Sequence, residues 1–134
     1  MNESKLILVL GDQLSLDQPA LKQSEPGRDI IVLAEVAEEA THVRHNRHKI
    51  ALLFAAMRHF RVELETLGYD VHYIAIDEGV ASLEVAVRNV LVQTAATEVV
   101  VCEPGEYRLV HQMRNLWSSS LGVPVTVLED ERFL

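Results

Sequence analysis

The sequence predicts an α/β fold, a Rossmann-like three-layer sandwich built on a five-stranded, mostly parallel sheet. Short runs rich in Ile, Val and Leu alternate with longer stretches in which apolar residues recur every three or four positions. The short runs are almost continuously apolar, as in residues 6–10 and 99–101, which is typical of strands covered on both faces. With 134 residues, 49% of them hydrophobic, residues 1–134 are expected to form one domain.

Five segments have the apolar, β-branched composition of buried strands. The predicted strands are residues 5–10, 30–34, 71–76, 98–102 and 125–128. Their order in the sheet stays open, because the first strand lies centrally in both common doubly wound arrangements.

The connection after the first strand is mostly polar and contains Pro19, Pro26 and Gly27. We therefore expect a long loop over residues 14–29, with one short helix at residues 19–23. After the second strand, apolar residues at helical spacing predict a long amphipathic helix that Gly68 ends. The apolar positions of this helix are Ile50, Leu53, Phe54, Met57, Phe60, Leu64 and Leu67.

Two further helices are predicted after the third and fourth strands. Ser82 is expected to cap the first of them, and Gly122 to end the second. Their apolar stripes are Leu83, Val87, Val90 and Leu91 in the first, and Val110, Met113, Trp117 and Leu121 in the second.

Charge and cysteine content exclude several classes of function. The 12 basic and 20 acidic residues give a formal charge of −8, which disfavours a domain that grips DNA through its overall field. The single cysteine, Cys102, allows neither an internal disulfide nor a four-thiolate metal cluster, and we expect a reducing cytoplasm as the compartment. No segment fits a signal peptide or a membrane span, so we expect neither.

Polar residues follow the predicted strands at their carboxyl ends, where open parallel sheets bind ligands. Gly11, Asp12 and Gln13 follow the first strand, Glu35 follows the second, and Glu103 follows the fourth. This pattern indicates a small polar ligand held by hydrogen bonds, although solvent-exposed loops would have a similar composition. No glycine-rich phosphate motif is present, which disfavours a dinucleotide or P-loop enzyme.

Residues 42–49 form the one basic segment, with three histidines, three permanent cations and no acid. Two interpretations stay open: a solvated helix start that complements Glu35, Glu38 and Glu39, or a patch that faces an anion or another domain. A metal site is disfavoured, because the neighbouring Arg44 and Arg47 would oppose a cation. Further along, Met57 and Phe60 are expected in the core, and Arg58 and Arg61 are expected to be exposed.

Several blocks of the chain resemble a single known family, and they keep its order and spacing. The most specific read G-D-Q-L at residues 11–14, A-M-R-H-F at 56–60 and E-P-G-E-Y-R at 103–108. Further similar segments are residues 6–10, 35–36, 44–45, 49–51, 129–130 and 133–134. The chain thus resembles, over almost its whole length, the deoxyribodipyrimidine photolyase-related proteins, which include the prokaryotic iron–sulfur (6-4) photolyases and cryptochromes.

This resemblance implies that the chain is the N-terminal antenna domain of a longer DNA-repair flavoprotein. Such a domain holds 6,7-dimethyl-8-ribityllumazine, which absorbs near-UV and blue light and passes its excitation to a flavin. FAD, a 4Fe–4S cluster and damaged DNA would be bound by a C-terminal helical domain that this fragment lacks. The parent would be a lyase, and this chain alone would lack the catalytic domain.

The resemblance also implies which residues contact the pigment. They are Gly11, Asp12, Gln13, Glu35, Val36, Glu39, Leu53 and Glu103. The carboxylate and amide side chains would bond the ribityl hydroxyls and the ring amide, and Leu53 would pack on the ring face. Two alternatives are a free-standing nucleotide- or small-molecule-binding module with a sensory role, and a domain with an empty pocket that only docks on a partner.

Overall fold

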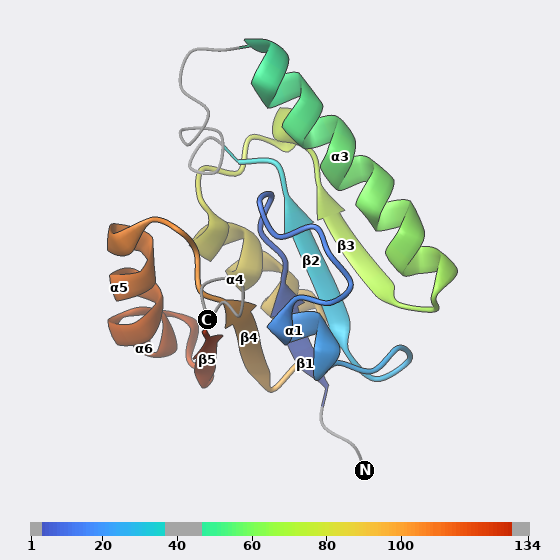
Figure 1. Ribbon diagram of the computed structural model, residues 1–134. Helices are drawn as coiled ribbons and strands as arrows, with labels where there is room; N and C mark the ends of the chain where they lie inside the picture. The colour runs from blue at the N-terminus through green and yellow to red at the C-terminus, as the bar shows by residue number, and fades with distance from the viewer. Residues whose placement is uncertain (1–3, 37–46, 130–134) are drawn as a thin grey trace.

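A parallel sheet lies between two layers of helices in this chain (Figure 1). The computed structural model describes residues 4–36 and 47–129, with the backbone alone at residues 47 and 48. The strands are β1 Lys5–Leu8, β2 Ile30–Ala34, β3 Asp70–Ile74, β4 Glu98–Cys102 and β5 Val125–Leu128. All pairings between neighbouring strands are parallel, which confirms the predicted α/β sandwich.

The strand order is β3-β2-β1-β4-β5, which resolves the choice that the sequence left open. Central β1 pairs with β2 on one side and with β4 on the other, so that Ile7 faces both Ile31 and Val100. After β3 the chain crosses back over the sheet and continues on the far side of β1. The switch point of the fold therefore lies between the carboxyl ends of β1 and β4.

Helices cover both faces of the sheet, as the continuous apolar strands require. In the described residues the helices are α1 Pro19–Lys22, α3 Arg47–Thr66, the 3-10 helix η2 Ile76–Glu78, α4 Leu83–Gln93, α5 Tyr107–Asn115 and α6 Trp117–Leu121. One core lies between the sheet and α1 with α3, and the other between the sheet and α4, α5 and α6. None of the helices in this part of the chain combines the length and apolar character needed to cross a bilayer.

Alternate residues of each central strand enter opposite cores. Leu6 and Leu8 of β1 pack on the α4 side, whereas Ile7 and Val9 pack on the α3 side with Met57. These side chains are almost completely buried, so both apolar faces of the strands contribute to stability.

The predicted helix boundaries are confirmed at three positions. The Ser82 hydroxyl accepts a hydrogen bond of 3.3 Å from the amide of Val85 at the start of α4. Gly68, with φ of +95°, follows α3, and Gly122, with φ of +75°, follows α6. Both glycines adopt the left-handed conformation that residues with a Cβ atom rarely tolerate.

Three elements differ from the predictions. The first strand spans Lys5–Leu8 rather than residues 5–10. The single helix expected across Trp117 is divided at Leu116 into α5 and α6. Next to this division, the side-chain amide of Asn115 bonds the His111 carbonyl at 3.0 Å, and it competes with the backbone amide for that acceptor. The third strand spans Asp70–Ile74 rather than residues 71–76, because the Ile76 amide bonds a side chain and begins η2 instead of continuing the ladder.

Candidate functional site

Polar segments meet at the carboxyl edge of the sheet, where the sequence predicted a ligand. Gly11, Asp12 and Gln13 follow β1, Glu35 follows β2, and Glu103 follows β4. Because β1 lies between β2 and β4, the fold brings these segments to the two sides of the switch point.

Gln13 joins the two strands that flank the switch point. Its side chain is 4% exposed, and Nε2 donates hydrogen bonds to the carbonyl oxygens of Cys102 at 3.2 Å and Glu103 at 2.9 Å. Two carbonyl acceptors require the nitrogen of the amide on that side, so the orientation of the amide is determined. The opposite atom, Oε1, is buried and accepts no hydrogen bond within residues 4–36 and 47–129. An unpaired buried acceptor is costly, and a donor from a ligand would satisfy it.

The loop after β4 is held by its own side chains. Glu103 is partly buried, and its carboxylate lies 3.3 Å from Nη2 of Arg114 on α5. Glu106 caps α5, since its carboxylate accepts hydrogen bonds from the amides of Arg108 at 3.1 Å and Leu109 at 2.9 Å. The two carbonyls that accept from Gln13 therefore lie at the end of β4, just before a capped helix start.

Glu35 is a fully buried carboxylate at the end of β2. Arg58 of α3 binds it in a bidentate manner, with Nε 2.6 Å from Oε2 and Nη2 2.8 Å from Oε1. The hydroxyl of Tyr73 also donates to Oε2, and the amide of Ile76 donates to Oε1 at 2.9 Å. Four donors from three further elements, α3, β3 and η2, therefore satisfy this one side chain.

The charge state of this cluster follows from its contacts. Burial alone would raise the pKa of Glu35, but hydrogen bonds from Arg58, Tyr73 and the Ile76 amide lower the pKa below its ordinary value of 4.5. Burial raises the pKa of Tyr73, and the hydrogen bond to the Glu35 carboxylate raises it further. The cluster is therefore a carboxylate, a guanidinium and a neutral phenol at physiological pH.

The remaining predicted contacts are less closely grouped. Gly11 is buried and Asp12 is exposed. Val36 is buried in the core on the α4 side, whereas half-buried Leu53 packs against the core on the α3 side. Glu39 and most of the basic segment, residues 42–46, lie outside the described residues.

Arg58 and Tyr73 are the members of this cluster that the sequence did not single out as functional. Arg58 was expected to be exposed, and its side chain is indeed 57% exposed although it binds Glu35. A usable signal was the position of Glu35 between Ala34 and Val36, because a carboxylate inside an apolar run requires a buried partner.

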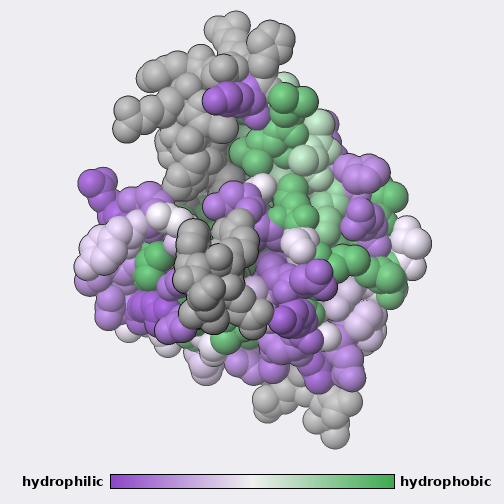
Figure 2. All heavy atoms as spheres, in the orientation of Figure 1, coloured by the Kyte–Doolittle hydropathy of each residue, from purple (hydrophilic) through white to green (hydrophobic). Residues whose placement is uncertain are grey.

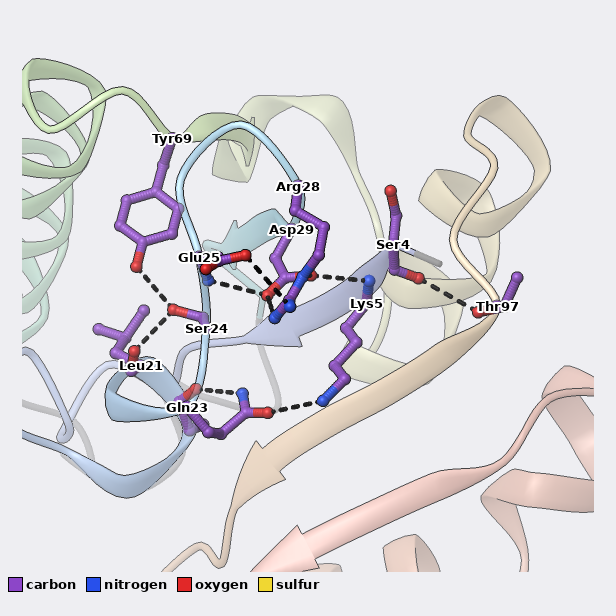
Figure 3. A network of polar contacts seen from close by, with 11 residues as sticks. Ser4, Lys5, Leu21, Gln23, Ser24, Glu25, Arg28, Asp29, Tyr69 and Thr97 are labelled. Atoms are coloured by element: carbon purple, nitrogen blue, oxygen red, sulfur yellow. Dashed lines mark hydrogen bonds and ion pairs between the residues drawn. The ribbon is translucent and has the colours of Figure 1, made fainter. Parts of the chain in front are cut away.

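A second polar network lies at the opposite, amino-terminal edge of the sheet (Figure 3). Asp29, which is 2% exposed, accepts from Nε and Nη2 of Arg28 at 2.9 and 2.8 Å. It also accepts from the amides of Lys5 at 3.1 Å and Glu25 at 2.9 Å. Beside this network is a groove of about 420 Å³ whose lining includes Asp70, and it is remote from the candidate site.

Potential metal ligands do not gather in the part of the chain that the structure describes: there, no three His, Cys, Asp or Glu side chains lie close enough to hold an ion. The groups that the structure shows at the candidate site are the amide of Gln13 and the polar segments around it.

Comparison with known proteins relates this chain to a family. Residues 7–134 match the family described as deoxyribodipyrimidine photo-lyase-related protein. The chain is also 40% identical over 133 residues to a protein of Agrobacterium fabrum named (6-4) photolyase. That match covers 98% of this chain and 26% of the relative, so the chain spans about a quarter of the length of the curated relative it matches.

Proposed function

Because the chain belongs to the deoxyribodipyrimidine photolyase-related family, we propose that it is the light-harvesting antenna domain of a photolyase- or cryptochrome-related flavoprotein. The proposed pigment is 6,7-dimethyl-8-ribityllumazine, held at the carboxyl edge of the sheet. When bound, this pigment would supply near-UV and blue absorption and transfer excitation to a flavin elsewhere in the parent protein.

The observation that carries this proposal is the unpaired Oε1 atom of Gln13. The ribityl hydroxyls and the ring amide of the lumazine offer the donors that this acceptor lacks. Gln13 is anchored through Nε2, so its Oε1 atom is presented in a fixed direction without a loss of side-chain entropy upon binding. Among the predicted contacts, Asp12 and Glu103 would supply further polar groups beside the same switch point.

The apolar part of the site would come from α3. Half-buried Leu53 lies in the second turn of this helix, which begins on the carboxyl side of β2. A leucine side chain there would pack on the flat ring and exclude water from it. The domain's own contribution is thus to hold and shield the pigment rather than to carry out bond chemistry.

Flavin, the iron–sulfur cluster and DNA would be bound by the rest of a longer parent protein. The single cysteine, Cys102, is 1% exposed and cannot supply four thiolates. The surface of α3 offers a place for a helical flavin domain to dock, since Figure 2 shows apolar residues gathered over this helix. Leu52 and Val62 on α3 are 69% and 57% exposed.

Pigment binding is tested by absorbance after incubation and gel filtration. The chain is incubated with 6,7-dimethyl-8-ribityllumazine, and the expected result is a near-visible band that co-elutes with the protein and is lost on denaturation. The matched ligand control is 6,7-dimethyllumazine, which lacks the ribityl chain. It should bind at least about tenfold more weakly, because the hydroxyl donors of that chain are missing.

The competing function is a nucleotide- or small-molecule-binding module. Titration with AMP distinguishes it: AMP binding without lumazine binding would replace the antenna proposal with this alternative. Binding of neither ligand would favour a domain that only docks on its partner.

A further inference from the structure

We propose that Arg58 and Tyr73 are positioning residues for the pigment site, acting through the carboxylate of Glu35 to hold α3 against the carboxyl edge of the sheet. This inference rests on the proposed antenna function. Neither residue belongs to the set of contacts that the family resemblance implies.

Glu35 with its donors Arg58, Tyr73 and the Ile76 amide, here called the Glu35 clamp, joins three parts of the fold to the end of β2. Glu35 continues β2, and its amide donates to the Ile74 carbonyl of β3 at 2.8 Å. Its carboxylate binds Arg58 of α3 and the Ile76 amide that begins η2. Tyr73 of β3 supplies the remaining donor. One buried side chain therefore determines how α3, β3 and η2 meet at the end of β2.

The clamp also reaches the turn of α3 that would contact the pigment. The Tyr73 hydroxyl lies 3.5 Å from the carbonyl oxygen of Phe54, the residue after Leu53. On the next turns of the same helix, the Arg61 guanidinium lies 5.5 Å from the centroid of the Tyr73 ring. Tyr73 thus contacts α3 on both sides of Arg58, and a shift of this ring would move Leu53 relative to the sheet.

The saturation of Glu35 changes the role expected for this residue. Each carboxylate oxygen accepts two hydrogen bonds from the domain, so both oxygens are already satisfied without a ligand. A ribityl hydroxyl would have to displace one of these donors. Glu35 is therefore assigned to placing the neighbouring segments, and Gln13, with its unpaired oxygen, to accepting from the pigment.

The amino-terminal edge of the sheet provides a matched control. There Asp29 is also buried and is bound by Arg28 and by two backbone amides, as Figure 3 shows. Both carboxylates flank β2 and both have one bidentate arginine. Loss of either arginine leaves a buried carboxylate without its cation and therefore lowers stability. Only the Glu35 clamp, however, lies at the proposed pigment site.

The test compares Arg58→Gln and Tyr73→Phe with Arg28→Gln in the 134-residue chain. The thermal midpoint, the dissociation constant for 6,7-dimethyl-8-ribityllumazine and the fluorescence anisotropy of the bound pigment are measured for each variant. We expect all three variants to lower the midpoint. Arg58→Gln and Tyr73→Phe should weaken lumazine binding by about tenfold, equivalent to about 1.4 kcal/mol, and lower the anisotropy, whereas Arg28→Gln should bind as the unmodified chain does.

Tyr73→Phe keeps the ring and removes only the hydroxyl, so it provides the result if Arg58→Gln does not fold. Equal dissociation constants in all variants would overturn the positioning role while leaving the antenna proposal intact. Lack of lumazine binding by the unmodified chain would overturn both. Equal weakening by Arg28→Gln would also reject the proposal, since the effect would then be a general loss of stability.

Discussion

Glu35 and Asp29 are buried carboxylates on either side of β2, and each is bound by one arginine. Such groups are costly to bury unless every oxygen accepts hydrogen bonds, and here each carboxylate is bonded by two side-chain nitrogens and at least one backbone amide. Gln13 differs from them because only its nitrogen is paired. At the scale of single residues, the two saturated carboxylates stabilise the fold, and under the proposed function the unpaired oxygen of Gln13 would accept from the pigment.

Replacement of Leu53 by Trp tests the apolar wall at this same scale. We expect Leu53→Trp to reduce lumazine affinity by at least about tenfold while the far-UV circular dichroism stays unchanged, because the larger ring fills the space for the pigment. Leu52→Trp is the matched control, since Leu52 is its neighbour on α3 and is 69% exposed. Equal affinity of the two variants, both folded, would remove Leu53 from the site.

At the scale of elements, the ends of α3 and α6 are the features that the sequence predicts most directly. Glycines with positive φ follow α3 and α6, so each helix stops where the next strand must begin. The division between α5 and α6 lies at Leu116, beside Asn115, whose side-chain amide bonds the His111 carbonyl. A helix end at glycine can be predicted from the sequence alone, whereas whether an asparagine side chain bonds the helix backbone depends on its surroundings.

Substitution of Gly122 isolates the contribution of backbone conformation. A Cβ atom at Gly122 or at Gly105 would meet no atom within 4 Å, but only Gly122 has a positive φ, of +75°. Gly122→Ala should therefore lower the free energy of unfolding by about 1 kcal/mol, and Gly105→Ala should be neutral or slightly stabilising. Urea denaturation measures both, and equal stabilities would show that the conformation at Gly122 carries no cost.

Across the whole molecule, the parallel sheet separates two polar edges with different roles. The carboxyl edge carries the switch point, Gln13 and the Glu35 clamp, and the amino edge carries the Asp29 network. The apolar strands between these edges bury both faces of the sheet. Under the proposed function the carboxyl edge would bind the pigment, while the Asp29 network holds the segments at the amino edge.

Acid should destabilise the molecule from both edges. Burial alone would raise the pKa of Asp29 and of Glu35, but hydrogen bonds lower each below its ordinary value, 3.8 and 4.5 respectively. Groups with a lowered folded-state pKa contribute stability above the unfolded-state value, and this contribution is lost as the pH falls through the folded-state pKa. We expect the urea midpoint to be constant from pH 7 to about pH 5 and to decrease below it. A midpoint that is unchanged at pH 3 would contradict this assignment.

Much of the fold could be predicted because it depends on local patterns. The five strands, the helical stripe that contains Met57 and the cap at Ser82 lie where they were predicted, apart from the ends of β1 and β3. The polar residues at the strand ends were also identified, because parallel strands place their carboxyl ends at one edge. Their contact with a pigment stays a prediction.

The sequence by itself determined the α/β class, both apolar faces of the sheet and the edge where polar groups gather, since these follow from the periodicity and composition of each segment. Only the tertiary structure decided the strand order, the pairing of Glu35 with Arg58 and Tyr73, and the unpaired oxygen of Gln13. These features depend on residues separated by 23 and 38 positions for Glu35, and by 89 for Gln13 and Cys102. No local pattern specifies such partners, because they meet only when the strands and helices have packed together.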